Sequence, residues 1–131
     1  MSSTMAGKLQ IKPGTQLAVL SAPAELVALL AAELPGIDVG EGVGRDTDSV
    51  LLCVRTHDEV DRLLGGAIAS VTGGGLLWVA YPKASSGVKT DLNRDRLWEA
   101  VLPSGWRPVR QVALSEAWSA IRLRPADMVG K

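Results

Sequence analysis

One continuous apolar run constrains the fold of this chain more than any other feature. Ser49-Val-Leu-Leu-Cys-Val54 has no polar side chain after its first position, as expected of a strand in a parallel sheet that is covered on both faces. Thr56-His-Asp-Glu59 follows and matches a helix capping box. Apolar residues then recur along one helical face, at Val60, Leu63, Leu64, Ala67, Ile68 and Val71. A buried strand followed by a sheet-facing helix predicts an α/β fold.

The same alternation extends along the rest of the chain. It predicts strands at 16–20, 37–39 and 76–80 and helices at about 23–34 and 92–102. Thr90 or Asp91 is expected to cap the later helix, because both side chains can accept a hydrogen bond from a free helix amide. The triplet Gly73–Gly75 follows the helical stripe and is predicted to end that helix before the next strand. A glycine-rich phosphate loop would instead follow a strand and open a helix.

Two closing strands complete the pattern, at about 107–114 and 118–123. Because so short a link joins them, they should pair as an antiparallel hairpin. The predicted fold is therefore a three-layer α/β/α sandwich whose mostly parallel sheet ends in a C-terminal antiparallel hairpin, with helices on both faces.

Length and composition limit the classes of function. The 131 residues suit a single domain, expected at 9–125 with tails at 1–8 and 126–131. Fourteen acids balance fourteen bases, so no global field favours nucleic acid or a membrane. The single Cys53 and the single His57 exclude a disulfide framework and His-pair metal motifs. With no targeting segment and one unpaired thiol, we expect a cytoplasmic protein without bound metal.

Two sets of residues resemble known families. Ile11–Leu20 and Thr72–Ala80 are similar to the lead-in to the first strand and to a glycine turn of class I methyltransferases. From about Lys8 to Arg124 the chain resembles more closely a bacterial family called domain of unknown function 3052. The stretches that carry this resemblance are Val50–Arg55, Leu76–Lys83, Ser86–Gly87, Thr90–Asp91 and Glu116–Ser119. It implies a Rossmann-like, methyltransferase-like fold and supplies no chemistry.

The resemblance raises the question of S-adenosylmethionine. Class I methyltransferases hold this cofactor against a glycine-rich turn after the first strand, where glycine lets the backbone approach the ligand. This chain has Ser21-Ala-Pro-Ala24 there, and Pro23 lacks an N–H. We therefore expect no cofactor, although a divergent S-adenosylmethionine-dependent methyltransferase stays an alternative, with Asp38 or Glu41 available for ribose hydroxyls.

The candidate ligand site lies where the strands end. Ligands of open α/β sheets bind beyond the carboxyl ends of the strands, which should bring together Ser21–Pro23, Arg55–His57 and Tyr81–Asp91. The last segment runs into a helix N-terminus, and its cations, hydroxyl groups and free amides suit a small anion. The residues assigned to this site are Lys83, Ser85, Ser86, Gly87, Thr90, Asp91, Arg55 and Ser21. In the alternative interpretation the segment is a surface loop, and Arg55 pairs with an acid such as Asp58.

No residue is assigned a catalytic role. His57 has no nucleophile beside it in sequence, and Cys53 lies within an apolar run and is expected to be a buried small hydrophobe. The chain is therefore interpreted as a non-catalytic binding or regulatory module, leaning away from an enzyme, with a small anionic ligand as its expected partner.

A third possibility is a protein-interaction module that uses the C-terminal Trp/Arg hairpin. Trp78 and Trp98 are expected in the core, whereas Trp106 and Trp118 flank the hairpin and could form an exposed patch. Six arginines could gather at the hairpin end: Arg94, Arg96, Arg107, Arg110, Arg122 and Arg124. They would suit an acidic partner, with nucleic acid less favoured, and edge-to-edge pairing into a homodimer is possible.

Overall fold

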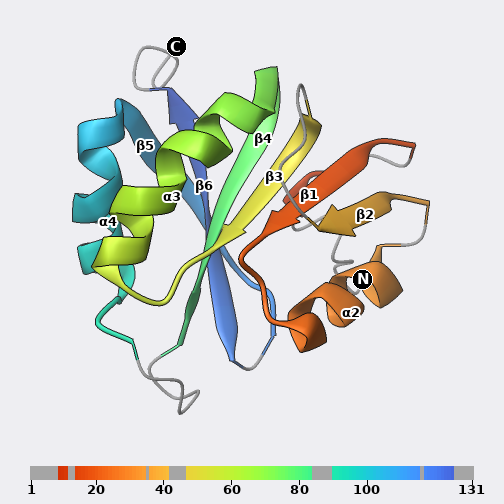
Figure 1. Cartoon of the computed structure of the whole chain (residues 1–131), viewed down its shortest axis with the longest axis horizontal. Coiled ribbons are helices and arrows are strands. Elements are labelled where there is room, and N and C mark those ends of the chain that lie inside the picture. The colour runs from red at the N-terminus through yellow and green to blue at the C-terminus, as the bar shows by residue number, and fades with distance from the viewer. Residues whose placement is uncertain are drawn as a thin grey trace.

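The predicted covered strand forms β3 (Thr47–Cys53), third in a six-stranded sheet. The computed structural model describes residues 9–11, 14–34, 36–41, 47–83, 90–115 and 117–125. The strand order is β2-β1-β3-β4-β6-β5, from β2 (Asp38–Glu41) and β1 (Gln16–Leu20) through β4 (Val71–Pro82) to β6 (Trp118–Pro125) and β5 (Trp106–Ala113) (Figure 1). β1 pairs parallel with β2 and β3, and β3 pairs parallel with β4, whereas β6 is antiparallel to β4 and β5. The mostly parallel sheet with its closing hairpin is confirmed.

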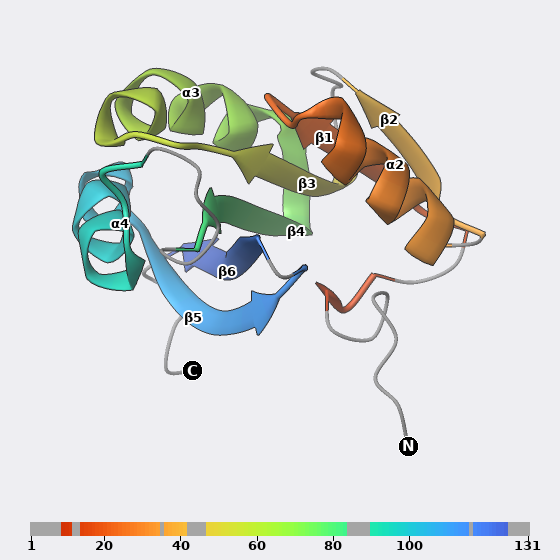
Figure 2. The same ribbon diagram turned by 90° about the horizontal axis from the view of Figure 1, so that it is seen from below.

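Helices cover both faces of the sheet, as predicted. α3 (His57–Ser70) and α4 (Arg94–Val101) lie on one face, and α2 (Ala24–Glu33) lies on the other (Figure 2). β3 accordingly alternates between two buried clusters: Val50 and Leu52 pack with the α3 side, and Leu51 and Cys53 with the α2 side. All four are at most 1% exposed, which accounts for the lack of polar residues in this run.

The helices begin at three different N-caps. Thr56 caps α3, because its Oγ1 accepts a hydrogen bond from the amide of Glu59. α4 is capped by Asn93, whose Oδ1 accepts from the amide of Arg96, so the prediction that Thr90 or Asp91 caps this helix is wrong. The Asn93 cap shortens the helix to 94–101, and a single 3₁₀ turn at Leu102–Ser104 follows it. α2 begins after Pro23 without a side-chain cap.

The glycine triplet does not stop a helix. α3 ends at Ser70, and β4 already begins at Val71 and continues through Gly73–Gly75. The register between β3 and β4 shifts there, from Thr47 opposite Val71 to Ser49 opposite Leu76. The triplet therefore belongs to an irregular stretch of strand, where glycine tolerates the bulged backbone. Pairing with β3 outweighed the local helix-stop signal.

The tryptophans are distributed differently from the prediction. Trp78 is fully buried as expected, but Trp98 on α4 is 43% exposed. The exposed patch considered for Trp106 and Trp118 is not found, because Trp118 is only 4% exposed and Trp106 is partly buried against the core. The expected tails 1–8 and 126–131 lie outside the described residues. Among the described helices, none is long and apolar enough to cross a membrane.

Candidate functional site

The carboxyl ends of three parallel strands place the predicted site residues at one edge of the sheet. β1, β3 and β4 end at Leu20, Cys53 and Pro82, and Ser21, Arg55 and Lys83 follow them directly or within two residues. β6 begins at the same edge, because Trp118 lies opposite Pro82 in the β4–β6 ladder. The edge therefore combines Ser21–Pro23, Arg55–His57 and the described start of the third predicted segment, 81–83, with the beginning of β6.

Two of the predicted segments are joined by hydrogen bonds. The Thr90 hydroxyl donates to the carbonyl of Arg55 at 2.5 Å and accepts from the amide of Leu92 at 3.0 Å. One carboxylate oxygen of Asp91 accepts from the amide of His57 at 2.9 Å. Because that amide opens α3, Asp91 adds a negative charge where the helix dipole favours one. Thr90 and Asp91 thus hold the start of α3 against the segment that leads to α4.

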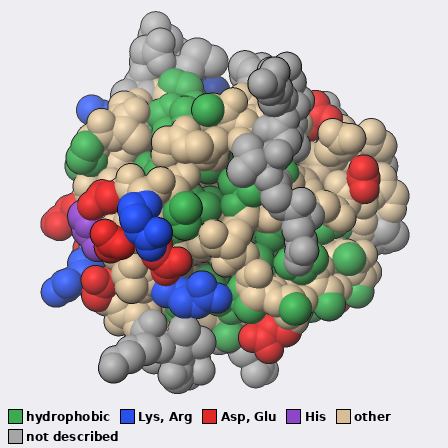
Figure 3. Space-filling model, in the orientation of Figure 1, with side chains coloured by type: hydrophobic (Ala, Val, Ile, Leu, Met, Phe, Trp, Pro, Cys, Tyr) green, Lys and Arg blue, Asp and Glu red, His purple; other side chains and the backbone are tan. Residues whose placement is uncertain are grey.

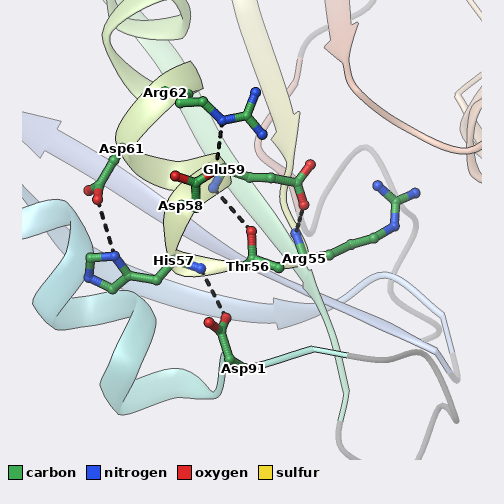
Figure 4. A network of polar contacts seen from close by, with 8 residues as sticks. All are labelled: Arg55, Thr56, His57, Asp58, Glu59, Asp61, Arg62 and Asp91. Carbon is green, nitrogen blue, oxygen red and sulfur yellow. Dashed lines mark hydrogen bonds and ion pairs between the residues drawn. The ribbon is translucent and has the colours of Figure 1, made fainter.

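A network of polar side chains surrounds the first turn of α3 (Figure 4). Glu59 accepts a hydrogen bond from the amide of Arg55 at 2.9 Å, which completes the predicted capping box one residue further upstream than in its usual form. The carboxylate of Asp58 pairs with Arg62 at 2.8 Å, so the expected pairing of Asp58 with Arg55 is wrong. The Arg55 side chain points away from that pair (Figure 4).

His57 and Cys53 have surroundings that favour neither as a catalytic group. The His57 side chain is half-exposed, and its Nδ1 lies 3.3 Å from the carboxylate of Asp61. The thiol of Cys53 is buried, and this burial raises its pKa to about 12 despite the nearby Arg55 charge. At neutral pH Cys53 is therefore a protonated thiol in the core, as predicted. Within the described residues, no group of three His, Cys, Asp or Glu side chains could hold a metal ion.

Arg55 is positioned by an aromatic ring. Its guanidinium carbon lies 5.6 Å from the centroid of the Trp118 ring, within the range of a cation–π contact. Lys83 is fastened to the same hairpin turn, since its amide donates to the carbonyl of Ala117 at 2.8 Å. Neither cation has a carboxylate partner within 4 Å among the described residues, where the ion pairs lie on α3. The Arg55 side chain and the Lys83 backbone thus both contact the closing hairpin at its start.

A groove of about 430 Å³ lies on the α2 side of the sheet and shares Trp118 with the Arg55 contact and Ala117 with the Lys83 backbone hydrogen bond. Its walls come from α2 and from the hairpin turn, and they are formed by Glu25, Leu26, Leu29, Ser115, Ala117 and Trp118. Most of this lining is apolar, with one carboxylate and one hydroxyl. The sequence interpretation did not place the hairpin turn at the site, because nothing local to Ser115–Trp118 indicates that the last strand inserts next to β4.

Ser21 faces a different groove. It lines a hollow of about 280 Å³ with Leu20, Leu52, Arg62, Leu63, Gly66 and Ala67, between β1 and α3. Its backbone φ is 58°, a left-handed conformation that costs a non-glycine residue about 1–2 kcal/mol. The remaining predicted site residues, Ser85, Ser86 and Gly87, lie outside the described residues.

Charged side chains of both signs cluster on one part of the face seen in Figure 3. Acidic and basic side chains and the histidine gather at the left, where Figure 1 shows the helix ends of α3 and α4, whereas hydrophobic side chains show near the middle and at the lower right. On α3, Asp58 is paired with Arg62, and Asp61 lies 3.3 Å from Nδ1 of His57.

Comparisons with known proteins agree with the fold. Residues 24–127 match the model of a family described as protein of unknown function (DUF3052). No curated protein matches the sequence. A candidate type 11 methyltransferase from Sulfolobus solfataricus is similar in structure, with a TM-score of 0.62 at 8% identity over 92% of this chain and 89% of that chain.

Two further crystal structures give the same result. A SAM-dependent methyltransferase from Aquifex aeolicus has a TM-score of 0.57 at 10% identity, covering 86% of this chain and 83% of its own. A ribosomal protein L11 methylase from Lactobacillus delbrueckii subsp. bulgaricus has a TM-score of 0.57 at 9% identity, covering 88% and 71%. At such identities the similarity establishes a methyltransferase-like fold and nothing about activity.

Proposed function

This chain belongs to the DUF3052 family of proteins of unknown function, and we propose that it is a non-catalytic binding or regulatory module that holds a small anionic ligand at the carboxyl edge of its sheet. The observation that carries the proposal is the Arg55 guanidinium, which lies over Trp118 beside an apolar groove without a described carboxylate partner. An arginine stacked on a ring keeps its planar row of donors in a set orientation, which suits a carboxylate or phosphate group.

The groove next to Arg55 limits what the ligand can be. Its leucine and tryptophan walls favour a ligand with an apolar body, and the backbone of Lys83, a predicted ligand contact, is bonded to the same turn. Glu25 also lines the groove and would repel a ligand with several negative charges. A ligand with one anionic group, an apolar part and a hydrogen-bond donor for Glu25 fits these features best.

The groups that could perform chemistry here support binding rather than catalysis. The Cys53 thiol is buried, and His57 is an exposed partner of Asp61. Thr90 and Asp91, which were assigned to the ligand, use their oxygen atoms to hold Arg55 and His57 in place. Thr90 therefore acts on the ligand through Arg55 and Asp91 positions the start of α3, while Ser85, Ser86 and Gly87 stay predicted contacts.

A divergent S-adenosylmethionine-dependent methyltransferase is the second candidate, and the shared fold is what favours it. The turn after β1 even keeps a left-handed residue at Ser21, a conformation that glycine adopts without strain. However, Ser21 and Ala22 carry side chains where a close backbone approach would need glycine, and Pro23 offers no amide. This turn does not fit the cofactor, so we assign it no role.

Calorimetry with a small panel tests the proposal. The probes are phenylacetate, phenyl phosphate and phenylalanine, which share an apolar ring and differ in charge, together with S-adenosylmethionine. We expect at least one ring-bearing anion to bind, and Arg55→Gln to weaken it by about tenfold or more, because a charge-assisted hydrogen bond contributes about 1.5–3 kcal/mol. Phenylalanine carries an ammonium group that phenylacetate lacks. Tighter binding of phenylalanine would therefore indicate that Glu25 pairs with an ammonium group of the ligand.

Arg96→Gln is the matched control, because Arg96 lies exposed on α4, away from the groove. It should bind the probes as the wild type does. The proposal fails if no ring-bearing anion binds at about 1 mM, or if Arg55→Gln binds as well as the control. Micromolar binding of S-adenosylmethionine would instead support the second candidate function, a divergent methyltransferase.

A further inference from the structure

Four arginines lie on one face of the closing hairpin. In the β5–β6 ladder Arg110 is directly opposite Arg122, and Arg107 is directly opposite Arg124. Cross-strand partners point to the same side of a sheet, as do residues two apart in one strand. The cross-strand neighbour of Arg122 on β4 is Trp78, which packs in the core cluster on the α2 side of the sheet. The pairing therefore places all four arginines on the α2 side. We call this set the arginine face.

The arginine face corresponds to part of the basic cluster predicted from the sequence. Arg96 does not contribute, because it lies on α4, which covers the opposite face of the sheet. Arg94 also starts α4, and its side chain is outside the described part of the structure. On the α2 side, α2 lies next to β1 and β2 (Figure 2). Residues 9–11 contact the hairpin on this side, because Trp78 Nε1 donates to the carbonyl of Leu9 and Arg122 Nη1 donates to the side chain of Gln10.

No described acid compensates these four charges. In the described ranges the ion pairs with a carboxylate are those of His57 and Arg62 on α3. The pKa of Arg122 is lowered, first by partial burial and then by the charges of Arg124 and Arg110. Its Nη1 donates to Gln10, whereas its Nε is buried without a hydrogen-bond partner. Like charges directly opposite each other destabilise a sheet, so this arrangement of arginines costs the fold stability.

From this arrangement we propose that the arginine face binds a compact oligophosphate, a short linear chain of phosphate groups. Opposite arginines have Cα atoms about 4.5–5.5 Å apart, and Arg122 and Arg124 lie about 6.6 Å apart along the strand. Four guanidinium groups within so small an area match an anion with several charges on neighbouring groups, and each can donate to two phosphate oxygens at once.

Other polyanions fit this face less well. Single-stranded nucleic acid is usually held by aromatic side chains on which bases stack. The exposed Trp98 lies on the α4 side of the hairpin, where it lines a hollow with Pro108 and Ile121, and of the four arginines only Arg110 also lines this hollow. An acidic peptide carries one charge per side chain and spreads its charges over a longer path. The face is also separate from the groove at Arg55, because Arg122 lies four residues along β6 from Trp118, about 13 Å away.

The test measures binding of sodium tripolyphosphate to the full chain by calorimetry. The variant is the triple substitution Arg107→Gln, Arg110→Gln and Arg124→Gln, which spares Arg122 and its bond to Gln10. The control is Arg62→Gln with Arg96→Gln, which removes two exposed arginines outside this face. We expect tripolyphosphate to bind wild type and control alike and the triple variant at least tenfold more weakly, with the wild-type affinity falling as salt rises.

Thermal unfolding without ligand supplies an independent readout. Because the triple variant loses like-charge repulsion, it should melt at the wild-type temperature or above it, and tripolyphosphate should no longer stabilise it. The proposal is overturned if tripolyphosphate does not bind at about 1 mM, if the control loses as much affinity as the triple variant, or if the triple variant melts well below the wild type. Tighter binding of decathymidylate or of polyglutamate than of tripolyphosphate overturns it as well, by assigning the face to a nucleic acid or to an acidic protein.

Discussion

Thr90 provides the most direct test of how the candidate site is held together. Its hydroxyl donates to the carbonyl of Arg55 and accepts from the amide of Leu92, so one oxygen atom joins the start of α3 to the segment before α4. Thr90→Val keeps the shape of the side chain and removes both bonds. If the bonds matter, this change should lower stability and loosen Arg55 together.

The expected size of the effect follows from the two bonds. A hydrogen bond between neutral groups contributes about 0.5–1.5 kcal/mol net, so losing both costs about 1–3 kcal/mol. Thr90 is half-buried, and water can reach part of the exposed polar atoms, which places the expected loss near 2 kcal/mol. For a chain of 131 residues the entropy of unfolding converts this loss into a fall of about 7 °C in melting temperature.

Urea unfolding followed by circular dichroism measures this loss, with Thr90→Ser as the matched control because serine keeps the hydroxyl. We expect Thr90→Ser to stay within about 1 kcal/mol of the wild type. Thr90→Val should bind the ring-bearing anion of the calorimetric panel more weakly than the wild type does, since the Arg55 backbone is released. A Thr90→Val protein as stable as the wild type would refute the reasoning. Equal losses in the two variants would also refute it, because the methyl group rather than the hydroxyl would then account for the stability.

Three further predictions concern single residues. Burial raises the pKa of Cys53 to about 12, so as the pH rises above about 9 the unfolded chain loses this proton before the folded one does. The free energy of unfolding should therefore fall between about pH 9 and 12, and the loss should reach about 2 kcal/mol near pH 10.5. Chemical denaturation of the wild type and Cys53→Ala at pH 8 and about 10.5 tests this, and equal pH slopes would contradict it. Asn93→Ala should cost about 1 kcal/mol in urea unfolding because α4 loses its cap, whereas Asn93→Asp should cost little; equal losses would exclude capping. Ser21→Gly removes a backbone strain of about 1–2 kcal/mol and adds a glycine entropy cost of about 0.5–1 kcal/mol. Scanning calorimetry should therefore show an unchanged or raised melting temperature. A lowered melting temperature would mean that the Ser21 side chain makes stabilising contacts.

Several elements could be predicted from the sequence because their signals are local. The apolar run of β3 and the capping box at Thr56 act over a few residues, and the structure contains both. The order of strands and helices then requires right-handed crossovers, which is why helices on both faces and a common carboxyl edge for Arg55 and Lys83 were also predictable. The glycine triplet misled the prediction because a local stop signal lost to pairing with β3.

Local pattern alone determined the α/β class, the position of most elements and the edge at which Arg55 and Lys83 emerge. Tertiary structure decided which tryptophan is buried: Trp118 is covered because β6 inserts between β4 and β5, and Trp98 is exposed because α4 turns its other side to the core. It also decided that Trp118 meets Arg55, although the two residues are far apart in sequence. Such contacts depend on how the antiparallel strand enters the sheet, and no periodicity within β6 specifies its neighbours.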